Sequence, residues 1–244
     1  MPAQRYDAID ALRGFALLWM VLFHFCFDLS HFGYWKQDFY HDPFWTGQRT
    51  AILSLFLFCA GLGQAVALQQ GQPWVRFWRR WGQIALCAVL VSLGSWLMFP
   101  RSFIHFGVLH GLAVMLILVR ISAPWAHWFW LLGGLAIGAK YAAAALLAGS
   151  PLEPVMNGGA LNWLGFVTRK PVTEDYVPVF PWIGVMWWGM ASGNLLLAQK
   201  SRWLSSARYS GAQSLAGMGR WSLSVYMVHQ PLLIGALALL GLVR

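Results

Sequence analysis

Charged residues are scarce in this chain: they make up 10% of its 244 residues, and only 8 residues are acidic. A soluble domain of this length needs a more highly charged surface, so the composition excludes an ordinary soluble domain. The 17 basic residues are too sparse to form a phosphate-binding surface, and we expect no nucleic-acid partner. The basic excess is better interpreted as a topology signal and as contact with anionic lipid.

Cysteine is also rare in this chain. The three cysteines, Cys26, Cys59 and Cys87, all lie in apolar runs. An odd number in such surroundings argues against a disulfide framework and against a cysteine-rich metal site. The chain has no HExxH motif either, and we expect no metal cofactor. The N-terminal segment MPAQRYDA lacks the features of a signal peptide, so we expect the first helix to be retained.

Apolar residues, by contrast, are abundant. They make up 59% of the chain, the mean hydropathy is +0.56, and there are 16 tryptophans. These values predict an all-α, polytopic membrane helix bundle of about seven transmembrane helices, each of roughly 20 residues. No repeat or linker divides the chain, so residues 1–244 are expected to form a single transmembrane domain. The expected spans are 8–30, 48–69, 80–99, 104–121, 124–148, 179–198 and 221–242.

The basic residues also predict the orientation of the chain in the membrane. With seven spans, ten lie on the side of the N-terminus: Arg5, Arg13, Arg76, Arg79, Arg80, Arg120, Lys200, Arg202, Arg208 and Arg220. Seven lie on the other side: Lys36, Arg49, Arg101, Lys140, Arg169, Lys170 and Arg244. Because cytoplasmic loops are enriched in arginine and lysine, we expect a multi-pass membrane protein with a cytoplasmic N-terminus.

Ionisable residues within the first expected span give the strongest functional signal. Asp10, Arg13, His24, Asp28 and His31 fall within a stripe about 60° wide on one helix face. Such groups are costly at membrane depth when they face lipid, so they normally face a bundle interior or a wet cavity. The stripe is therefore a candidate functional site.

Histidines are concentrated on one side of the expected bundle. Histidine can take a proton from a hydroxyl or an amine. Sites in helix bundles are built by convergence of side chains from several helices. Six of the seven histidines lie near the expected outer ends of spans or in outer loops: His24, His31, His41, His105, His110 and His229.

His24 and Asp28 are four residues apart and can touch on one helix face. A carboxylate beside an imidazole fixes its tautomer, which is the arrangement of a general base. The alternative is a buried polar clamp that holds helices together.

Six ordered segments carry a resemblance to a known family. They are RYDAIDALRGFALLWMVLFH, YHDPFWTG, LSLFLFCAGLGQAV, IHFGVLHGLAV, EDYVPVFPWIGVMWWGMASG and GRWSLSVYMVHQPL. Together they resemble the bacterial relatives of the heparan-alpha-glucosaminide N-acetyltransferase catalytic domain, within the wider group of transmembrane acyltransferases. The resemblance covers nearly the whole chain and implies a location in the bacterial inner membrane.

The resemblance implies transfer of an acetyl group from acetyl-CoA to an amine or hydroxyl of a glycan or similar acceptor. The catalytic histidine of the lysosomal enzyme lies in the loop after the first span, and His41 in HDPFWTG matches that place. In the first span, the position that is Asn in that enzyme resembles the position of His24 in this chain. His41, His24 or both could therefore remove the acceptor proton, with Asp28 orienting His24. Direct transfer is expected, and an acyl-histidine intermediate is the alternative.

Several residues are candidates for contact with the acyl donor. Arg13, three residues from Asp10, could meet a CoA phosphate, or the two could form a structural salt bridge. Arg76, Arg79 and Arg80 could attract the nucleotide, or act as positive-inside anchors. His110 and His229 are further candidates, with a bridging role between helices as the alternative.

Two other classes of function fit the same residues. A proton-coupled transporter or flippase of a lipid-linked or small polar substrate would use histidine and aspartate as a proton relay. A non-catalytic assembly partner would need the histidines for stability alone. For the acyltransferase, the expected partners are acyl-CoA, the acceptor, membrane lipid and a second copy in a homodimer.

Overall fold

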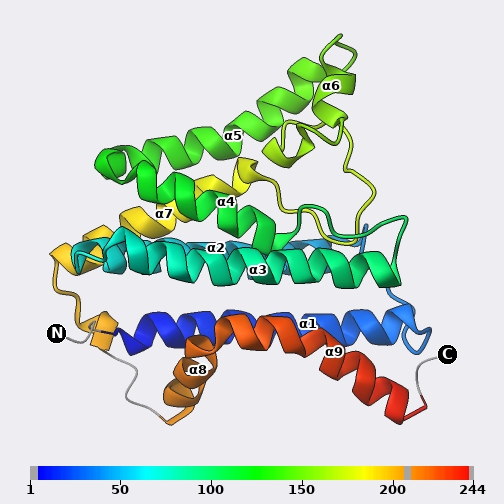
Figure 1. Cartoon of the computed structure of the whole chain (residues 1–244), viewed down its shortest axis with the longest axis horizontal. Helices are drawn as coiled ribbons and strands as arrows, with labels where there is room; N and C mark the ends of the chain where they lie inside the picture. Colours follow the sequence, from blue (N-terminus) through cyan, green and yellow to red (C-terminus); the bar gives the residue numbers. More distant parts are fainter. Residues whose placement is uncertain (1–4, 206–209, 242–244) are drawn as a thin grey trace. The chain divides into compact units, whose positions relative to one another are not determined.

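A computed structural model describes residues 5–205 and 210–241 and confirms the all-α prediction. Three long helices come first, α1 (Asp7–His31), α2 (Pro43–Gln69) and α3 (Trp74–Met98), as Figure 1 shows. They are followed by α4 (Val108–Ile121), the 3-10 helix η1 (Ala123–Trp128), α5 (Phe129–Leu147), α6 (Glu153–Asn157) and the 3-10 helix η2 (Asn162–Leu164). The last elements are α7 (Val179–Ala198), the 3-10 helix η3 (Arg202–Ser205), α8 (Ser210–Arg220) and α9 (Ser222–Leu239).

A helix lies at each of the seven positions where a span is predicted. Within the described residues, five helical segments are long and apolar enough to cross a membrane: 7–31, 43–69, 74–98, 123–147 and 222–239. The chain is therefore a multi-pass membrane protein. The α4 helix has only 14 residues, or about 21 Å of length, which is shorter than the hydrocarbon core. The α7 helix has 20 residues and is long enough, but it is not among these five segments.

The fourth predicted span begins too early. Residues 104–107 are not helical, because the backbone of Ile104 bonds to serines of α3 instead of to a following turn. The Ser95 hydroxyl accepts from the Ile104 N–H at 2.9 Å, and the Ser92 hydroxyl donates to the Ile104 carbonyl at 2.6 Å. Phe106 then forms an isolated bridge with Tyr176, and the helix starts only after Gly107.

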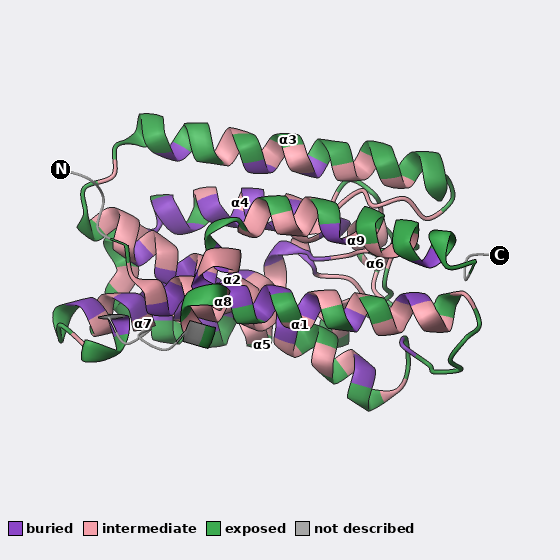
Figure 2. Cartoon of the chain, turned by 90° about the horizontal axis from the view of Figure 1, so that it is seen from below, coloured by how far each residue is buried: buried purple, intermediate pink, exposed green. Residues whose placement is uncertain are grey.

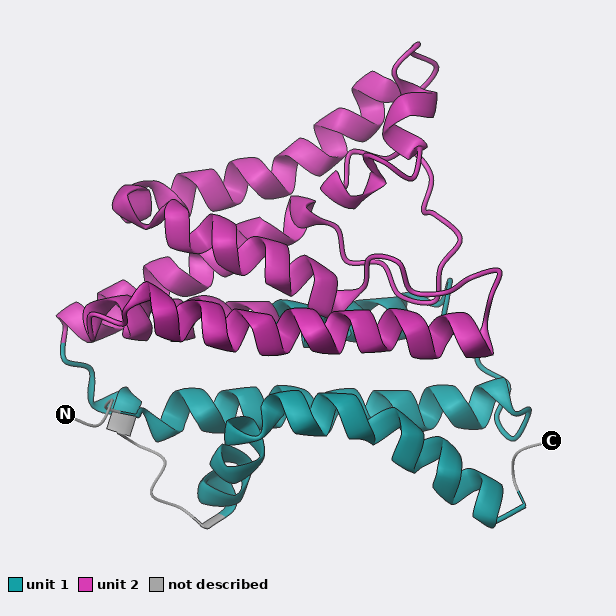
Figure 3. Ribbon diagram, viewed as in Figure 1, with its two compact units in different colours: residues 1–56, 200–244 teal, residues 57–199 magenta. Residues whose placement is uncertain are grey.

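The chain divides into two compact units, which Figure 3 shows in different colours. Unit 1 contains residues 1–56 and 200–244, and unit 2 contains residues 57–199. Of the charges counted for the orientation, Arg208 and Arg244 lie outside the described residues, as does residue 242 of the last predicted span.

Within unit 1, α1 packs along both α8 and α9. The α8 helix is absent from the sequence prediction, since its small residues give no apolar run. Its contact with α1 is made by two glycines, which let the backbones approach closely. A Cβ on Gly14 would lie 1.9 Å from the carbonyl oxygen of Leu215, and a Cβ on Gly219 would lie 1.9 Å from that of Asp10.

Within unit 2, α7 is the interior helix. It packs against α5, where Gly133 and Gly184 face each other, and a Cβ on Gly184 would lie 2.5 Å from the Gly133 carbonyl oxygen. It also packs against the second half of α2, where a Cβ on Gly61 would lie 2.2 Å from the carbonyl oxygen of Met186. An interior helix meets protein rather than lipid, and many residues of α7 are accordingly buried, Ile183 and Met186 among them.

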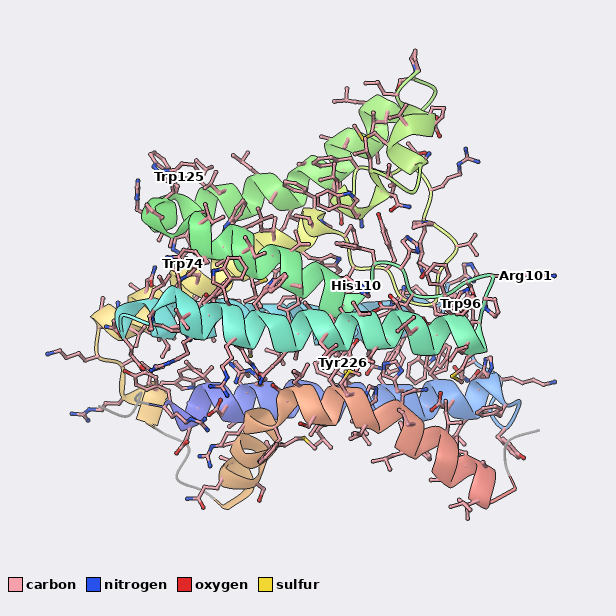
Figure 4. All side chains as sticks on the ribbon, in the orientation of Figure 1. Trp74, Trp96, Arg101, His110, Trp125 and Tyr226 are labelled. Carbon is pink, nitrogen blue, oxygen red and sulfur yellow. The ribbon has the colours of Figure 1, made fainter. Side chains whose placement is uncertain are left out.

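The α3 helix shows the membrane-facing surface of unit 2. Most of its residues are exposed, and Figure 2 colours it green over much of its length. In Figure 4, Trp74 and Trp125 lie toward one end of this unit, and Trp96 and Arg101 toward the other. Trp74 and Trp96 are separated by about 33 Å of helix, close to the thickness of the hydrocarbon core. They fit two interfacial aromatic belts.

The glycine contact between α1 and α8 predicts a sharp difference between two substitutions in the same helix. Gly219→Ala should destabilise the protein by about 1–3 kcal/mol, because the new methyl group meets backbone that cannot move aside. Gly217→Ala should be neutral or stabilise it by up to about 1 kcal/mol, since nothing lies within 4 Å of that position. Thermal unfolding in detergent, followed by tryptophan fluorescence, measures both. Equal effects would contradict the close contact.

Candidate active site

An aromatic cluster in unit 1 holds the loop that carries His41. Phe39 in this loop is 3% exposed, and its ring stacks on Trp45 of α2 with centroids 4.1 Å apart. The rings of Phe23 and Phe27 in α1 meet the Phe39 ring edge-on, with centroid distances of 5.5 and 5.4 Å. The burial of Phe39 therefore fixes the loop backbone against both helices.

A histidine and a carboxylate form a pair in this loop. His41 Nδ1 lies 3.0 Å from Oδ2 and 3.2 Å from Oδ1 of Asp38. Oδ1 of Asp38 also accepts from the backbone N–H of His41 at 2.9 Å and of Tyr40 at 3.0 Å. These backbone bonds, that of His41 first, hold the pKa of Asp38 below its usual value. The carboxylate therefore stays ionised at neutral pH.

The geometry of this pair assigns a role to each imidazole nitrogen. When Nδ1 donates its hydrogen to the Asp38 carboxylate, Nε2 carries the free lone pair. The His41 side chain is 86% exposed, so a substrate can reach Nε2. Such a pair can accept a proton from an amine or a hydroxyl. Sequence reasoning missed Asp38, because an irregular loop has no period that would predict a contact between residues three positions apart.

A cavity of about 590 Å³ adjoins this loop and is lined by residues of unit 1 alone. Trp19 Nε1 donates to Gln48 Oε1 at 2.9 Å, and Trp45 Nε1 donates to Gln37 Oε1 at 3.2 Å, so two indoles and two amides are held in place. Asp42, the residue after His41, also lines the cavity. The lining residues are Trp19, Leu22, Phe23, Cys26, Trp35, Gln37, Asp42, Phe44, Trp45 and Gln48.

Two predicted site histidines meet within the membrane-spanning part of unit 1. The rings of His24 in α1 and His229 in α9 have centroids 5.0 Å apart. His229 Nδ1 donates to the carbonyl oxygen of Tyr226 at 2.6 Å, and its Nε2 is buried without a partner. No group of three possible metal ligands is found in residues 5–205 and 210–241.

Asp28 is directed toward α9 rather than toward His24. Its Oδ1 accepts from Gln230 Nε2 at 2.7 Å, and the residue is 3% exposed. No hydrogen bond joins Asp28 to His24 in the part of the chain that the structure describes. The expected pairing of a carboxylate with a histidine is instead found at Asp38 and His41.

Asp10 and Arg13 form the expected pair, with Arg13 Nη1 2.9 Å from Asp10 Oδ1. Arg220 of α8 joins it, with its Nη2 2.7 Å from Asp7 and its Nε 3.8 Å from Asp10. This network ties α1 to α8 next to the glycine contact, which favours the structural alternative for Asp10 and Arg13.

The other predicted donor contacts lie in unit 2. Arg76 and Arg80 are exposed in the first turns of α3, and Arg80 Nη1 donates to Gln83 at 2.9 Å. His110 Nδ1 accepts from the Gly107 N–H at 3.3 Å, so its Nε2 donates to the Ser92 hydroxyl at 3.0 Å. His110 therefore bridges α3 and α4, as the alternative for this residue states.

Comparison with known proteins identifies one family. The model of the family described as "Heparan-alpha-glucosaminide N-acetyltransferase, catalytic" matches residues 5–231, nearly the whole chain. No curated protein and no solved structure matches the chain significantly. This match confirms the family that the motifs resemble, and a bacterial origin stays a prediction.

The bond between Asp28 and Gln230 predicts a coupled pair. Gln230→Leu should destabilise the protein by about 1–3 kcal/mol, because it leaves a buried carboxylate oxygen without its donor. The double variant Asp28→Leu with Gln230→Leu should recover much of that loss, since both polar groups are then removed. Thermal unfolding of the single and double variants gives the coupling energy. Additive effects would show that the two side chains act independently.

Proposed function

Since the chain belongs to the family of heparan-alpha-glucosaminide N-acetyltransferase catalytic domains, we propose that it transfers an acetyl group from acetyl-CoA to an amine or hydroxyl of a glycan or related acceptor. His41 acts as the general base. The family match supports the reaction class and the donor. The observation that carries the role of His41 is its 3.0 Å contact with the Asp38 carboxylate.

In the proposed reaction, the acceptor nitrogen or oxygen attacks the carbonyl carbon of the thioester. Nε2 of His41 takes the proton from the attacking atom, while Asp38 stabilises the imidazolium that forms. The new C–N or C–O bond replaces the C–S bond, and CoA leaves as a thiolate that is then protonated. His41 returns its proton to solvent, which its exposure allows.

His24 is the second candidate for the base. It has a neighbouring imidazole, that of His229, but the described residues give it no carboxylate partner to set its tautomer. The carboxylate on its own helix is held by Gln230. These contacts favour His41, and they give His24, Asp28 and His229 the role of polar residues that join α1 to α9.

For the acyl donor, the exposed arginines of α3 support a binding role. Arg76 and Arg80 are exposed at the start of α3, where guanidinium groups can meet the phosphates of CoA. Arg13 has its charge balanced by Asp10, so we assign it to positioning of α1. With the N-terminus in the cytoplasm of a bacterial inner membrane, the loop of His41 lies on the outer side. A homodimer remains a prediction.

Turnover of acetyl-CoA with an amino-sugar acceptor tests the proposal. His41→Ala should lower kcat by about 10²–10⁴-fold while the protein still binds CoA, because only proton transfer is lost. His127→Ala should change nothing, since this exposed histidine lies in η1 and is not part of the loop. Release of free thiol measures the rate in nanodiscs. A normal rate in His41→Ala together with an inactive His24→Ala would assign the base to His24 instead.

If Asp38 acts through His41, the effect of changing Asp38 should depend on the presence of His41. Asp38→Asn should lower kcat by about 10- to 100-fold, because the amide no longer fixes the imidazole tautomer. Combined with His41→Ala, it should cause no further loss, since the carboxylate acts only through His41. The same thiol assay measures all three variants. A further loss in the double variant would show that Asp38 acts independently of His41.

A further inference from the structure

The cavity beside the His41 loop continues as a groove along α1. A second cavity of about 210 Å³ is lined by Phe15, Leu18, Trp19 and Leu22. Trp19 and Leu22 also line the cavity of about 590 Å³. The two cavities therefore share a wall, and we call them together the α1 groove. All its lining residues belong to unit 1.

The long part of the α1 groove is apolar and open to lipid. Phe15, Leu18 and Leu22 lie on one helix face and are 45%, 38% and 55% exposed. From Phe15 to Cys26 the groove extends over about 16 Å of helix, roughly half of the hydrocarbon thickness. This length matches one leaflet. A hydrocarbon chain that lies in the leaflet can enter the groove sideways.

The wide end of the α1 groove is lined mostly by aromatic and other apolar side chains, and it also holds the polar residues of the groove. Gln37, Gln48 and Asp42 lie there among indole rings, and a volume near 590 Å³ is typical of small-molecule sites. Indole rings with nearby amides suit a head group that has both an apolar face and hydroxyls. Because Asp42 follows His41 directly, this end of the groove lies next to the proposed base.

The charge of the groove argues against the acyl donor as its occupant. Among the described residues, no arginine or lysine lines either cavity, and the carboxylate in the lining is that of Asp42. CoA carries several phosphates, which an acidic site repels. An acceptor amine, which is cationic before it reacts, is attracted by the same carboxylate.

We propose that the acceptor is lipid-linked: its hydrocarbon chain lies in the α1 groove, and its amine- or hydroxyl-bearing head group lies at Gln37, Gln48 and Asp42. This inference rests on the proposed acetyl transfer and names the substrate class of the same site. A separate chain-binding site near the base fits an open apolar groove that carries its polar residues at one end. This binding mode requires the acceptor to reach His41 from within the membrane.

The kinetic experiment compares two acceptors in nanodiscs, methyl and dodecyl glucosaminide, each with a free amine and with acetyl-CoA as donor. For the wild type, kcat/KM should be about 10-fold or more higher for the dodecyl compound, because its chain is buried in the groove. Leu22→Trp fills the groove, so this ratio should fall toward one. Leu93→Trp on α3, at a leucine of similar exposure, should leave the ratio unchanged.

Partition of the dodecyl chain into the nanodisc acts equally on all three proteins, so the change in ratio between variants isolates the groove. Equal ratios in the wild type and Leu22→Trp would overturn the inference while leaving acetyl transfer intact. Absence of thiol release with either acceptor would instead overturn the proposed function. Faster reaction with lauroyl-CoA than with acetyl-CoA, lost in Leu22→Trp, would assign the groove to the donor and overturn the inference.

A binding experiment tests the groove without turnover. Dodecyl glucosaminide with a diazirine on its chain should crosslink to residues 15–26 of α1, as mass spectrometry of the labelled peptides would show. Unlabelled dodecyl glucosaminide should compete for this label, and dodecyl phosphocholine should compete at least about 10-fold less well, because its quaternary ammonium has no hydrogen to donate to Asp42 and the carboxylate repels its phosphate. Equal competition would show that the groove holds ordinary membrane lipid and would overturn the inference.

Discussion

Hydrocarbon offers no hydrogen-bond partners, and this constraint organises the polar residues of both units. In unit 1, Arg13 and Arg220 balance Asp7 and Asp10 where α1 meets α8, and Gln230 donates to Asp28 where α1 meets α9. In unit 2, His110, Ser92 and Ile104 form a chain of hydrogen bonds that joins α3 to the start of α4. Polar groups at membrane depth therefore act mainly as connections between helices.

The proposed reactive pair lies outside the hydrocarbon region, where water can satisfy polar groups. His41 and Asp38 are in the loop between α1 and α2, and their side chains are 86% and 54% exposed. Water and substrate reach them there, while Phe39, buried between α1 and α2, keeps the loop in one conformation. The aromatic cluster thus keeps the loop rigid, while the imidazole that it carries stays accessible for proton transfer. The α1 groove runs from this loop into the lipid-facing surface of the same helix.

Local sequence patterns predicted some contacts correctly and assigned a wrong partner to Asp28. The spacing of Asp10 and Arg13 predicted their ion pair, since residues three apart on a helix are neighbours. The same rule allowed Asp28 to touch His24, but a side chain on a helix can also reach a facing helix, and Gln230 lies 202 positions away in the sequence. Asp38 was not found because the fold of an irregular loop has no period from which contacts can be read.

The sequence by itself determined the all-helical, membrane-spanning class and the positions of the long helices, because the hydrophobic length of a span is a local property. It also determined the family, through motifs spread over nearly the whole chain. Tertiary structure alone decided that α7 is an interior helix, that α8 exists and packs on Gly14, and that Asp38 rather than Asp28 accompanies a histidine. These features depend on which backbones approach closely and which side chains meet across helices, and neither is encoded in a local pattern.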